Sequence, residues 1–177
     1  MRFAIRFVLV AFLAVATTAT AANNITPPDQ FFGFQLGADG ELAHWDKIVE
    51  YFELLDRESD RIQVTNLGPS TEGHPYLLVI ISSPENMANL DRLREVNKQI
   101  QDPHKTEAEV RELIKEGKAV VSQSFGLHST EVAGAQTAPE LAYDFLSRDD
   151  EETLRILDNT ILLLFPNFNP DGQIMVR

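Results

Sequence analysis

His128 and Glu131, two side chains that commonly bind metals, stand three positions apart. They follow an apolar run over residues 119–125 that predicts a buried strand and a turn marked by Gly126, and a helix is expected to begin where they stand. Residues three apart at a helix start lie on one face. An imidazole and a carboxylate placed in this way can hold a zinc ion and leave coordination positions open for water and substrate. The spacing makes His128 and Glu131 candidate zinc ligands.

The same four-residue pattern occurs a second time, at His104 and Glu107. His104 follows a polar turn, residues 101–103, between two helical patterns, which predicts a solvated loop histidine near a helix N-terminus. His128 instead follows an apolar strand and a glycine, and α/β folds place their sites at such strand ends. From spacing and context alone, two interpretations of His128 and Glu131 stay open: they are zinc ligands, or a surface pair that caps a helix.

Three stretches of the sequence resemble motifs of a known family and follow one another in the same order as in that family. Residues 67–73, Leu-Gly-Pro-Ser-Thr-Glu-Gly, resemble the family's turn between its first two strands, although His74 stands where arginine is usual. Residues 126–131, Gly-Leu-His-Ser-Thr-Glu, come next, and a later apolar strand ends in residues 166–172, Pro-Asn-Phe-Asn-Pro-Asp-Gly. Together they are similar to the zinc metallocarboxypeptidases of the carboxypeptidase A type.

The resemblance implies a hydrolase that removes C-terminal residues from peptides or proteins, with a peptide or protein C-terminus as its substrate. It implies that His128 and Glu131 are the first two zinc ligands. The family also uses a downstream histidine as third ligand, arginines that bind the substrate's carboxylate, and a late glutamate as general base. None of these has a matching position here. No catalytic residue is therefore assigned, the substrate-binding residues are unknown, and the third zinc ligand is expected beyond residue 177.

The sequence thus predicts the N-terminal portion of an exported zinc carboxypeptidase. This chain alone is expected to be inactive, because the third ligand and the general base are missing. Two other classes stay open. One is a non-catalytic carboxypeptidase-like binding domain, which an exposed apolar sheet edge covered by a partner would favour. The other is a different α/β hydrolase, but the sequence contains no Gly-x-Ser-x-Gly nucleophile elbow.

Residues 1–21 have the pattern of a secretory signal peptide. Arg2 and Arg6 form a positive start, residues 7–15 an apolar core, and residues 19–21, Ala-Thr-Ala, a small-residue cleavage site. The apolar run is too short to span a bilayer comfortably, so a membrane anchor is the less favoured interpretation. We therefore expect a secreted or periplasmic protein whose mature part, residues 22–177, is one truncated peptidase domain.

The charge balance narrows the choice of partners. Without residues 1–21, 13 basic and 27 acidic residues remain, a formal net charge of −14. Nucleic acids and anionic membrane surfaces need basic patches, so neither is expected as a partner after signal cleavage. The sequence has no cysteine, which fits a bacterial exported protein better than a disulfide-rich module.

Apolar periodicity predicts an α/β fold, a partial mixed or parallel sheet with helices on both faces. The resemblance implies the N-terminal part of a carboxypeptidase A-like α/β/α fold. We expect Pro139 to kink its helix or to begin a new one, because proline lacks a backbone N–H, and residues 169–172 to form a tight turn. Strands are expected at residues 61–67, 76–82, 119–125 and 160–165, and helices at 41–55, 84–102, 106–115, 132–146 and 151–157.

Overall fold

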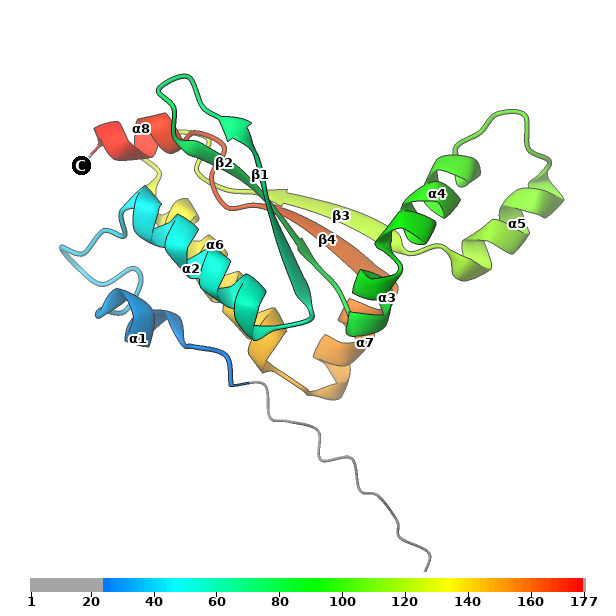
Figure 1. Cartoon of the computed structure of the whole chain (residues 1–177), viewed down its shortest axis with the longest axis horizontal. Helices are drawn as coiled ribbons and strands as arrows, with labels where there is room; N and C mark the ends of the chain where they lie inside the picture. The colour runs from blue at the N-terminus through cyan, green and yellow to red at the C-terminus, as the bar shows by residue number, and fades with distance from the viewer. Residues whose placement is uncertain (1–23, 177) are drawn as a thin grey trace, which may run out of the picture.

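The computed structural model describes residues 24–176 and shows a four-stranded sheet with helices packed against it (Figure 1). The predicted signal peptide, residues 1–21, lies outside the described residues, as does residue 177. No helix within residues 24–176 has the length and apolar character needed to cross a bilayer.

The strands form a mixed sheet in the order β1-β2-β4-β3. Strands β1 and β2 are an antiparallel hairpin, β2 pairs with β4 antiparallel, and β3 pairs with β4 in parallel. The carboxyl ends of β3 and β4 therefore lie at the same end of the sheet. This arrangement confirms the predicted mixed α/β sheet. The strands are β1 (Ile62–Pro69), β2 (Pro75–Ile81), β3 (Ala119–Ser124) and β4 (Thr160–Phe165).

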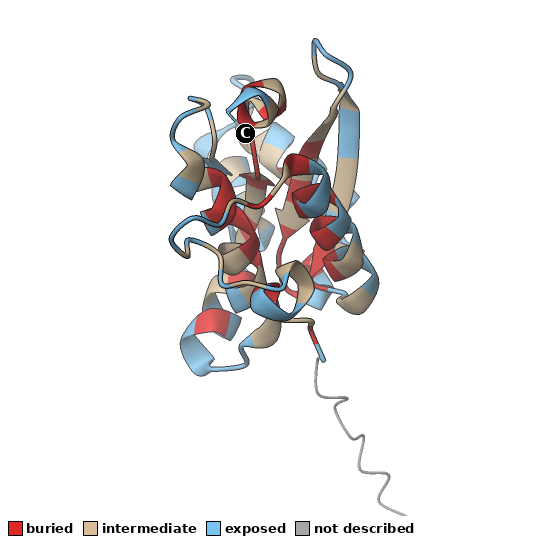
Figure 2. Cartoon of the chain, turned by 90° about the vertical axis from the view of Figure 1, so that its left-hand side faces the viewer, coloured by how far each residue is buried: buried red, intermediate tan, exposed pale blue. Residues whose placement is uncertain are grey.

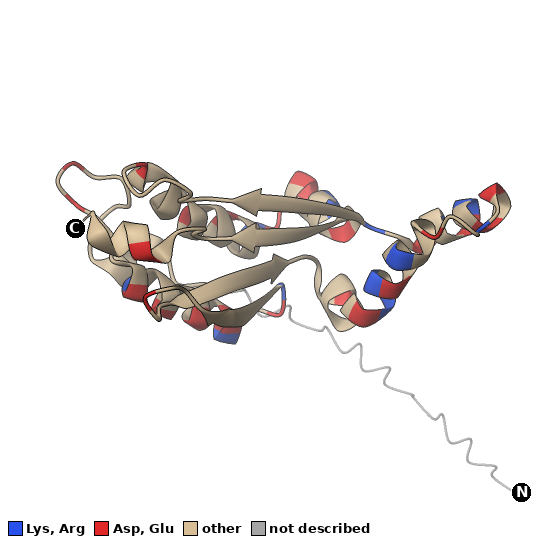
Figure 3. Ribbon diagram, turned by 90° about the horizontal axis from the view of Figure 1, so that it is seen from above, with Lys and Arg blue, Asp and Glu red and all other residues tan. Residues whose placement is uncertain are grey.

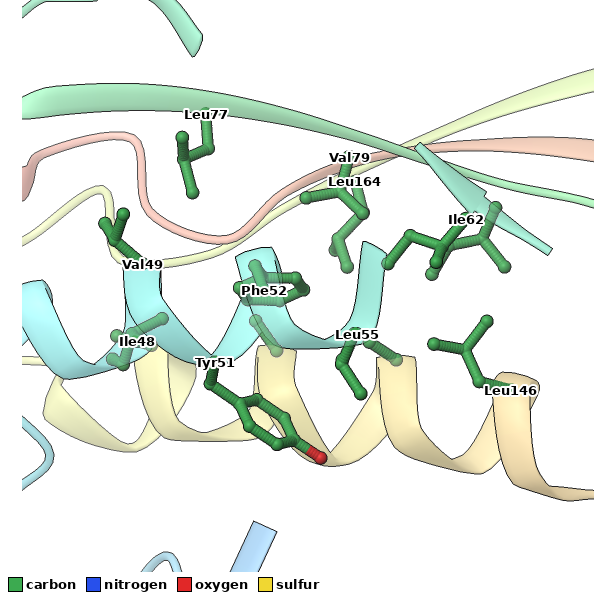
Figure 4. Packing of buried hydrophobic residues seen from close by; sticks show 14 of the residues in the cluster. Ile48, Val49, Tyr51, Phe52, Leu55, Ile62, Leu77, Val79, Leu146 and Leu164 are labelled. Atoms are coloured by element: carbon green, nitrogen blue, oxygen red, sulfur yellow. The ribbon is translucent and has the colours of Figure 1, made fainter. Parts of the chain in front are cut away.

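Helices α2 (Trp45–Glu58) and α6 (Val132–Ser147) cover one face of the sheet and bury the core. Phe52 and Leu55 of α2 are fully buried because they stand at helical spacing on the side that faces the strands. Leu164 of β4 belongs to the same cluster, and Figure 4 shows these side chains pointing toward one another. Figure 2 shows the buried residues gathered between the helices and the strands.

The opposite face is only partly covered. Helix α4 (Leu90–Ile100) lines a pocket of about 490 Å³ there, together with Ile80, Val120 and Leu163. Helix α5 (Glu107–Glu116) packs on α4 and keeps all of its residues at least partly exposed. The two helices project from the end of the sheet as a hairpin (Figure 1), and charges of both signs line them (Figure 3).

Strand β3 stands at the edge of the strand order, and each of its residues is exposed. Val120 and Val121, which face opposite sides, are 50% and 48% exposed. On the α6 side, Val121 lines a second pocket of about 250 Å³ with Phe145 and Leu162. The edge strand therefore leaves apolar surface open on both faces of the sheet.

The helix predicted over residues 84–102 is in fact two helices, α3 (Pro84–Ala88) and α4. The buried Asn86 side chain donates to Ser82 Oγ at 2.9 Å and to the Leu157 carbonyl at 3.0 Å, which holds α3 against the segment before β4. Asn89 then closes α3 by donating its N–H to the Asn86 carbonyl at 3.0 Å, and the chain turns into α4. The break between α3 and α4 therefore depends on tertiary hydrogen bonds, which cannot be predicted from the spacing of apolar residues.

Pro139 does not break α6, which runs continuously through it. A proline in a helix interior costs about 3 kcal/mol. Here Pro139 is fully buried, as are Ala138 and Ala142 of the same helix, and packing against the core offsets the missing hydrogen bond. Helix α7 (Glu151–Asn159) follows and completes the connection to β4.

Residues 169–172 begin a helix rather than form an isolated tight turn. Asn169 caps α8 (Pro170–Met175), its side-chain oxygen accepting from the Gly172 N–H at 2.9 Å. Pro170 occupies the first helical position, where a missing N–H costs little.

Replacing Phe52 by alanine should lower the free energy of unfolding by about 3–5 kcal/mol, because a fully buried aromatic ring is lost from the core. Urea unfolding followed by circular dichroism measures this change. The neighbouring Glu53→Ala is a matched control on the exposed side of α2 and should change stability by less than about 0.5 kcal/mol. Equal effects of the two variants would contradict the core described above.

The Glu140→Gln variant should be more stable than the wild type at pH 7 but not at pH 3. Burial raises the pKa of the Glu140 carboxyl above its ordinary 4.5, and Asp144 of α6 and Asp29 of α1 (Pro28–Phe32) raise it further. Tyr51 of α2 also lies near it. A raised folded-state pKa means that the ionised carboxylate opposes folding above that pKa and not below 4.5.

Thermal unfolding at both pH values measures the difference between wild type and Glu140→Gln, with Glu53→Gln as an exposed control. A gain that persists at pH 3, where the wild-type carboxyl is protonated, would show that charge is not its cause.

Candidate metal centre

The segment after β3 is held between β4 and the residues that follow β4. The Phe125 N–H donates to the Phe165 carbonyl at 3.1 Å, and the Phe125 carbonyl accepts from the Phe168 N–H at 2.8 Å. Gly126 then turns the chain with a φ of +61°, a conformation that favours glycine. Because β3 and β4 are parallel neighbours, the loops at their carboxyl ends meet, as is typical of sites in α/β sheets.

His128 and Glu131 face each other at this end of the sheet. His128 Nδ1 and Glu131 Oε1 are 3.0 Å apart, and their side chains are 68% and 65% exposed. A tight turn brings them together, since the Glu131 N–H donates to the His128 carbonyl at 3.1 Å. Glu131 occupies the N-cap position of α6, but its carboxylate points to His128 instead of capping the helix. The pair is thus accessible to a ligand and positioned by a short local turn.

A pocket of about 400 Å³ lies beside Glu131. Its wall includes Gly126, Thr130 and Gly134 together with the larger Phe125 and Leu127, and His128 is not part of it. The pocket is bounded by the end of β3 and the first turn of α6, the two elements that position the pair.

The donor set suits zinc, which binds imidazole nitrogen and carboxylate oxygen. Among residues 24–176, however, no group of three or more His, Cys, Asp or Glu side chains could hold a metal ion. His128 and Glu131 could therefore supply two protein ligands, and a complete zinc site needs at least one more. The fit of this pair to zinc stays a prediction.

The other histidines that the sequence singled out lie elsewhere. His104 is exposed in the loop before α5, and Glu107 pairs with Arg111 at 2.5 Å instead of with His104. His74 stands in the turn between β1 and β2, where its backbone N–H donates to Ser70 Oγ at 2.9 Å. Both arrangements agree with the loop and turn roles expected of these histidines.

The three motif stretches, far apart in sequence, come together through α8. The Asp171 carboxylate accepts from Ser70 Oγ and, at 3.2 Å, from the Glu72 N–H, which ties the β1–β2 turn to α8. Asn169 donates its side-chain amide to the Leu127 carbonyl at 3.3 Å, which ties α8 to the loop of His128. All three stretches are therefore linked at the end of the sheet where the candidate ligands lie.

Sequence reasoning missed one residue of this region, Asn167. Its side chain is fully buried behind the loop, although asparagine in a turn is usually exposed. The only signal was its place directly after an apolar strand, inside residues 166–172, where the pattern was interpreted as a turn.

The chain is similar to known proteins in sequence and in fold. A family model described as zinc carboxypeptidase matches residues 48–177. Carboxypeptidase A from Helicoverpa armigera is 18% identical with a TM-score of 0.54, and the match covers 84% of this chain and 32% of that protein. A search of curated proteins finds no match.

Two further solved structures are similar. Thrombin activatable fibrinolysis inhibitor is 12% identical with a TM-score of 0.53 and coverage of 86% and 30%. A metallo-carboxypeptidase from Burkholderia cenocepacia is 16% identical with a TM-score of 0.50 and coverage of 73% and 27%. At these identities the likeness concerns the fold, and the chain spans about a third of the length of the structures it matches.

The Glu131→Gln variant should change the free energy of unfolding by less than about 1 kcal/mol, because both side chains of the pair are mostly exposed and a contact between exposed side chains contributes little. Chemical unfolding of wild type and variant at pH 7 measures the change. A loss well above this value would mean that the pair serves stability rather than ligand binding.

Proposed function

The chain belongs to the zinc carboxypeptidase family, and from this premise we propose that it is part of an exported enzyme that hydrolyses C-terminal residues from peptides or proteins. His128 and Glu131 are two of the ligands of its zinc ion. One observation carries this assignment: the imidazole and the carboxylate lie 3.0 Å apart, exposed, at the carboxyl end of β3.

The chain's own residues have a defined part in this function. When bound, zinc polarises the scissile carbonyl and lowers the pKa of a coordinated water. His128 and Glu131 would hold the ion from one side, and their exposure leaves its other side open to water and substrate. The pocket of about 400 Å³ that Glu131 lines would offer space for water or substrate on the Glu131 side of the pair.

The chain alone should not catalyse the reaction. The described residues provide two ligands, and no general base is assigned among them. Because the chain spans about a third of its solved relatives, we propose that a third ligand and the base come from additional polypeptide. Secretion or a periplasmic location is part of the same proposal, and the pattern of residues 1–21 supports it.

A second candidate is a non-catalytic binding domain with the same fold. The exposed edge of β3 favours it, since an uncovered apolar edge strand readily pairs with another polypeptide. Zinc binding separates the candidates, because only the peptidase needs His128 and Glu131 as ligands.

Zinc titration of residues 22–177 by calorimetry tests the proposed ligands. We expect weak binding that His128→Ala lowers on the order of a hundredfold, since structural sites with four ligands gain roughly 10–16 kcal/mol, or about 3 kcal/mol per ligand. The His104→Ala variant removes the histidine of the second copy of the same sequence pattern and is the matched control.

Unchanged zinc binding in His128→Ala, or equal losses in the two variants, would rule out the assignment of His128. The binding-domain alternative would then be the remaining candidate.

A further inference from the structure

Asn167, which follows β4, is the central member of a buried polar network. Its side-chain oxygen accepts from the Asn169 N–H at 2.8 Å, and its amide donates to Gln173 Oε1. Gln173 of α8 in turn donates to the Ala43 carbonyl at 3.0 Å, and the Ala43 N–H donates to Gln136 of α6 at 3.4 Å. The network thus joins the end of β4, α8, the segment before α2, and α6.

The loop that carries His128 rests directly on this carboxamide. A Cβ atom built on Gly126 would lie 2.5 Å from Asn167 Oδ1, closer than real contacts allow. Two hydrogen bonds reinforce the contact, from the Phe168 N–H to the Phe125 carbonyl and from the Asn169 side chain to the Leu127 carbonyl. Residues 125–127 are therefore held in place by their contacts with residues 167–169.

The first helical turns after the ligands are held by the same network. Helix α6 begins directly after Glu131, and Gln136 is a buried residue early in that helix. Through Ala43 and Gln173, Gln136 is connected to Asn167. Asn167 therefore supports the loop before the ligand pair directly and the helix after it indirectly.

We propose that Asn167 is a positioning residue for the metal ligands His128 and Glu131. The inference rests on the proposed function, because a positioning role requires that His128 and Glu131 bind a metal. Both ligands are exposed and hold little of their own position by packing. Their placement depends on the backbone beneath them, and partners behind a metal ligand commonly affect metal affinity strongly.

The protein offers a matched control at the other end of the sheet. Asn86 is also a buried asparagine, with its amide donating to Ser82 Oγ and to the carbonyls of Leu157 and Asp158. Asn86→Leu and Asn167→Leu each remove a buried carboxamide and leave partners unsatisfied. Only Asn167 contacts the ligand loop.

Amide hydrogen exchange of residues 22–177, followed by NMR, tests the proposal without metal. In Asn167→Leu, the N–H groups of Phe168, Asn169 and Glu131 should exchange about tenfold faster than in Asn86→Leu. Equal exchange at these residues in the two variants would overturn the positioning role.

Zinc titration supplies the second readout. Asn167→Leu should lower zinc affinity about tenfold, whereas Asn86→Leu should leave it unchanged. Should Asn167→Leu fail to fold, Gln173→Met is a milder variant that removes one partner and keeps the Asn167 contact with Gly126. It should show both effects in the same direction, and its failure to do so would overturn the proposal.

The two proposals fail in different ways. Absence of His128-dependent zinc binding in the wild type would overturn the assigned function, and with it the purpose given to Asn167. His128-dependent zinc binding in the wild type, combined with unaltered loop exchange or unaltered zinc affinity in Asn167→Leu, would overturn the positioning role alone.

Discussion

The parallel pairing of β3 with β4 is the constraint on which the rest of the structure depends. It runs in register from Ala119 opposite Thr160 to Ser124 opposite Phe165. Parallel neighbours cannot be joined by a short turn, so the chain must cross the sheet, and α6 and α7 form that crossing. The crossing begins at Glu131, and β4 delivers the Asn-Pro-Asp-Gly segment beside it. The candidate metal centre is thus a consequence of one strand pairing.

Much of the fold could be predicted because single elements carry their own periodicity. The continuous apolar run predicted β4 at its observed bounds, Thr160–Phe165. The apolar stripe predicted the existence of α2, although the helix begins and ends later than expected, at Trp45 and Glu58. Sequence reasoning failed where contacts between elements decide the local geometry. Buried hydrogen bonds of Asn86 split one expected helix. Helix α6 is continuous through Pro139, so the new helix start that was one of two expectations there is wrong.

The candidate site divides in the same way. His128 and Glu131 are close in sequence, so their adjacency followed from spacing, although nothing in the spacing decides whether they bind a metal. The meeting of Ser70 with Asp171 and of Leu127 with Asn169 depends on strand order, which one sequence does not reveal. The burial of Asn167 was not predicted, because a polar residue near a turn is ordinarily exposed to solvent. The hydrogen-bonded network around it explains the burial, and that network is visible only in the folded structure.

The projecting hairpin of α4 and α5 also has a practical value for spectroscopy. Its tip, residues 101–104, is exposed and lies at the opposite end of the sheet from α8 (Figure 1). The sequence has no cysteine, so one introduced there would be the single thiol for attaching a fluorophore or spin label. A dye placed at this tip would report tumbling and association of the whole protein while remaining remote from His128 and Glu131.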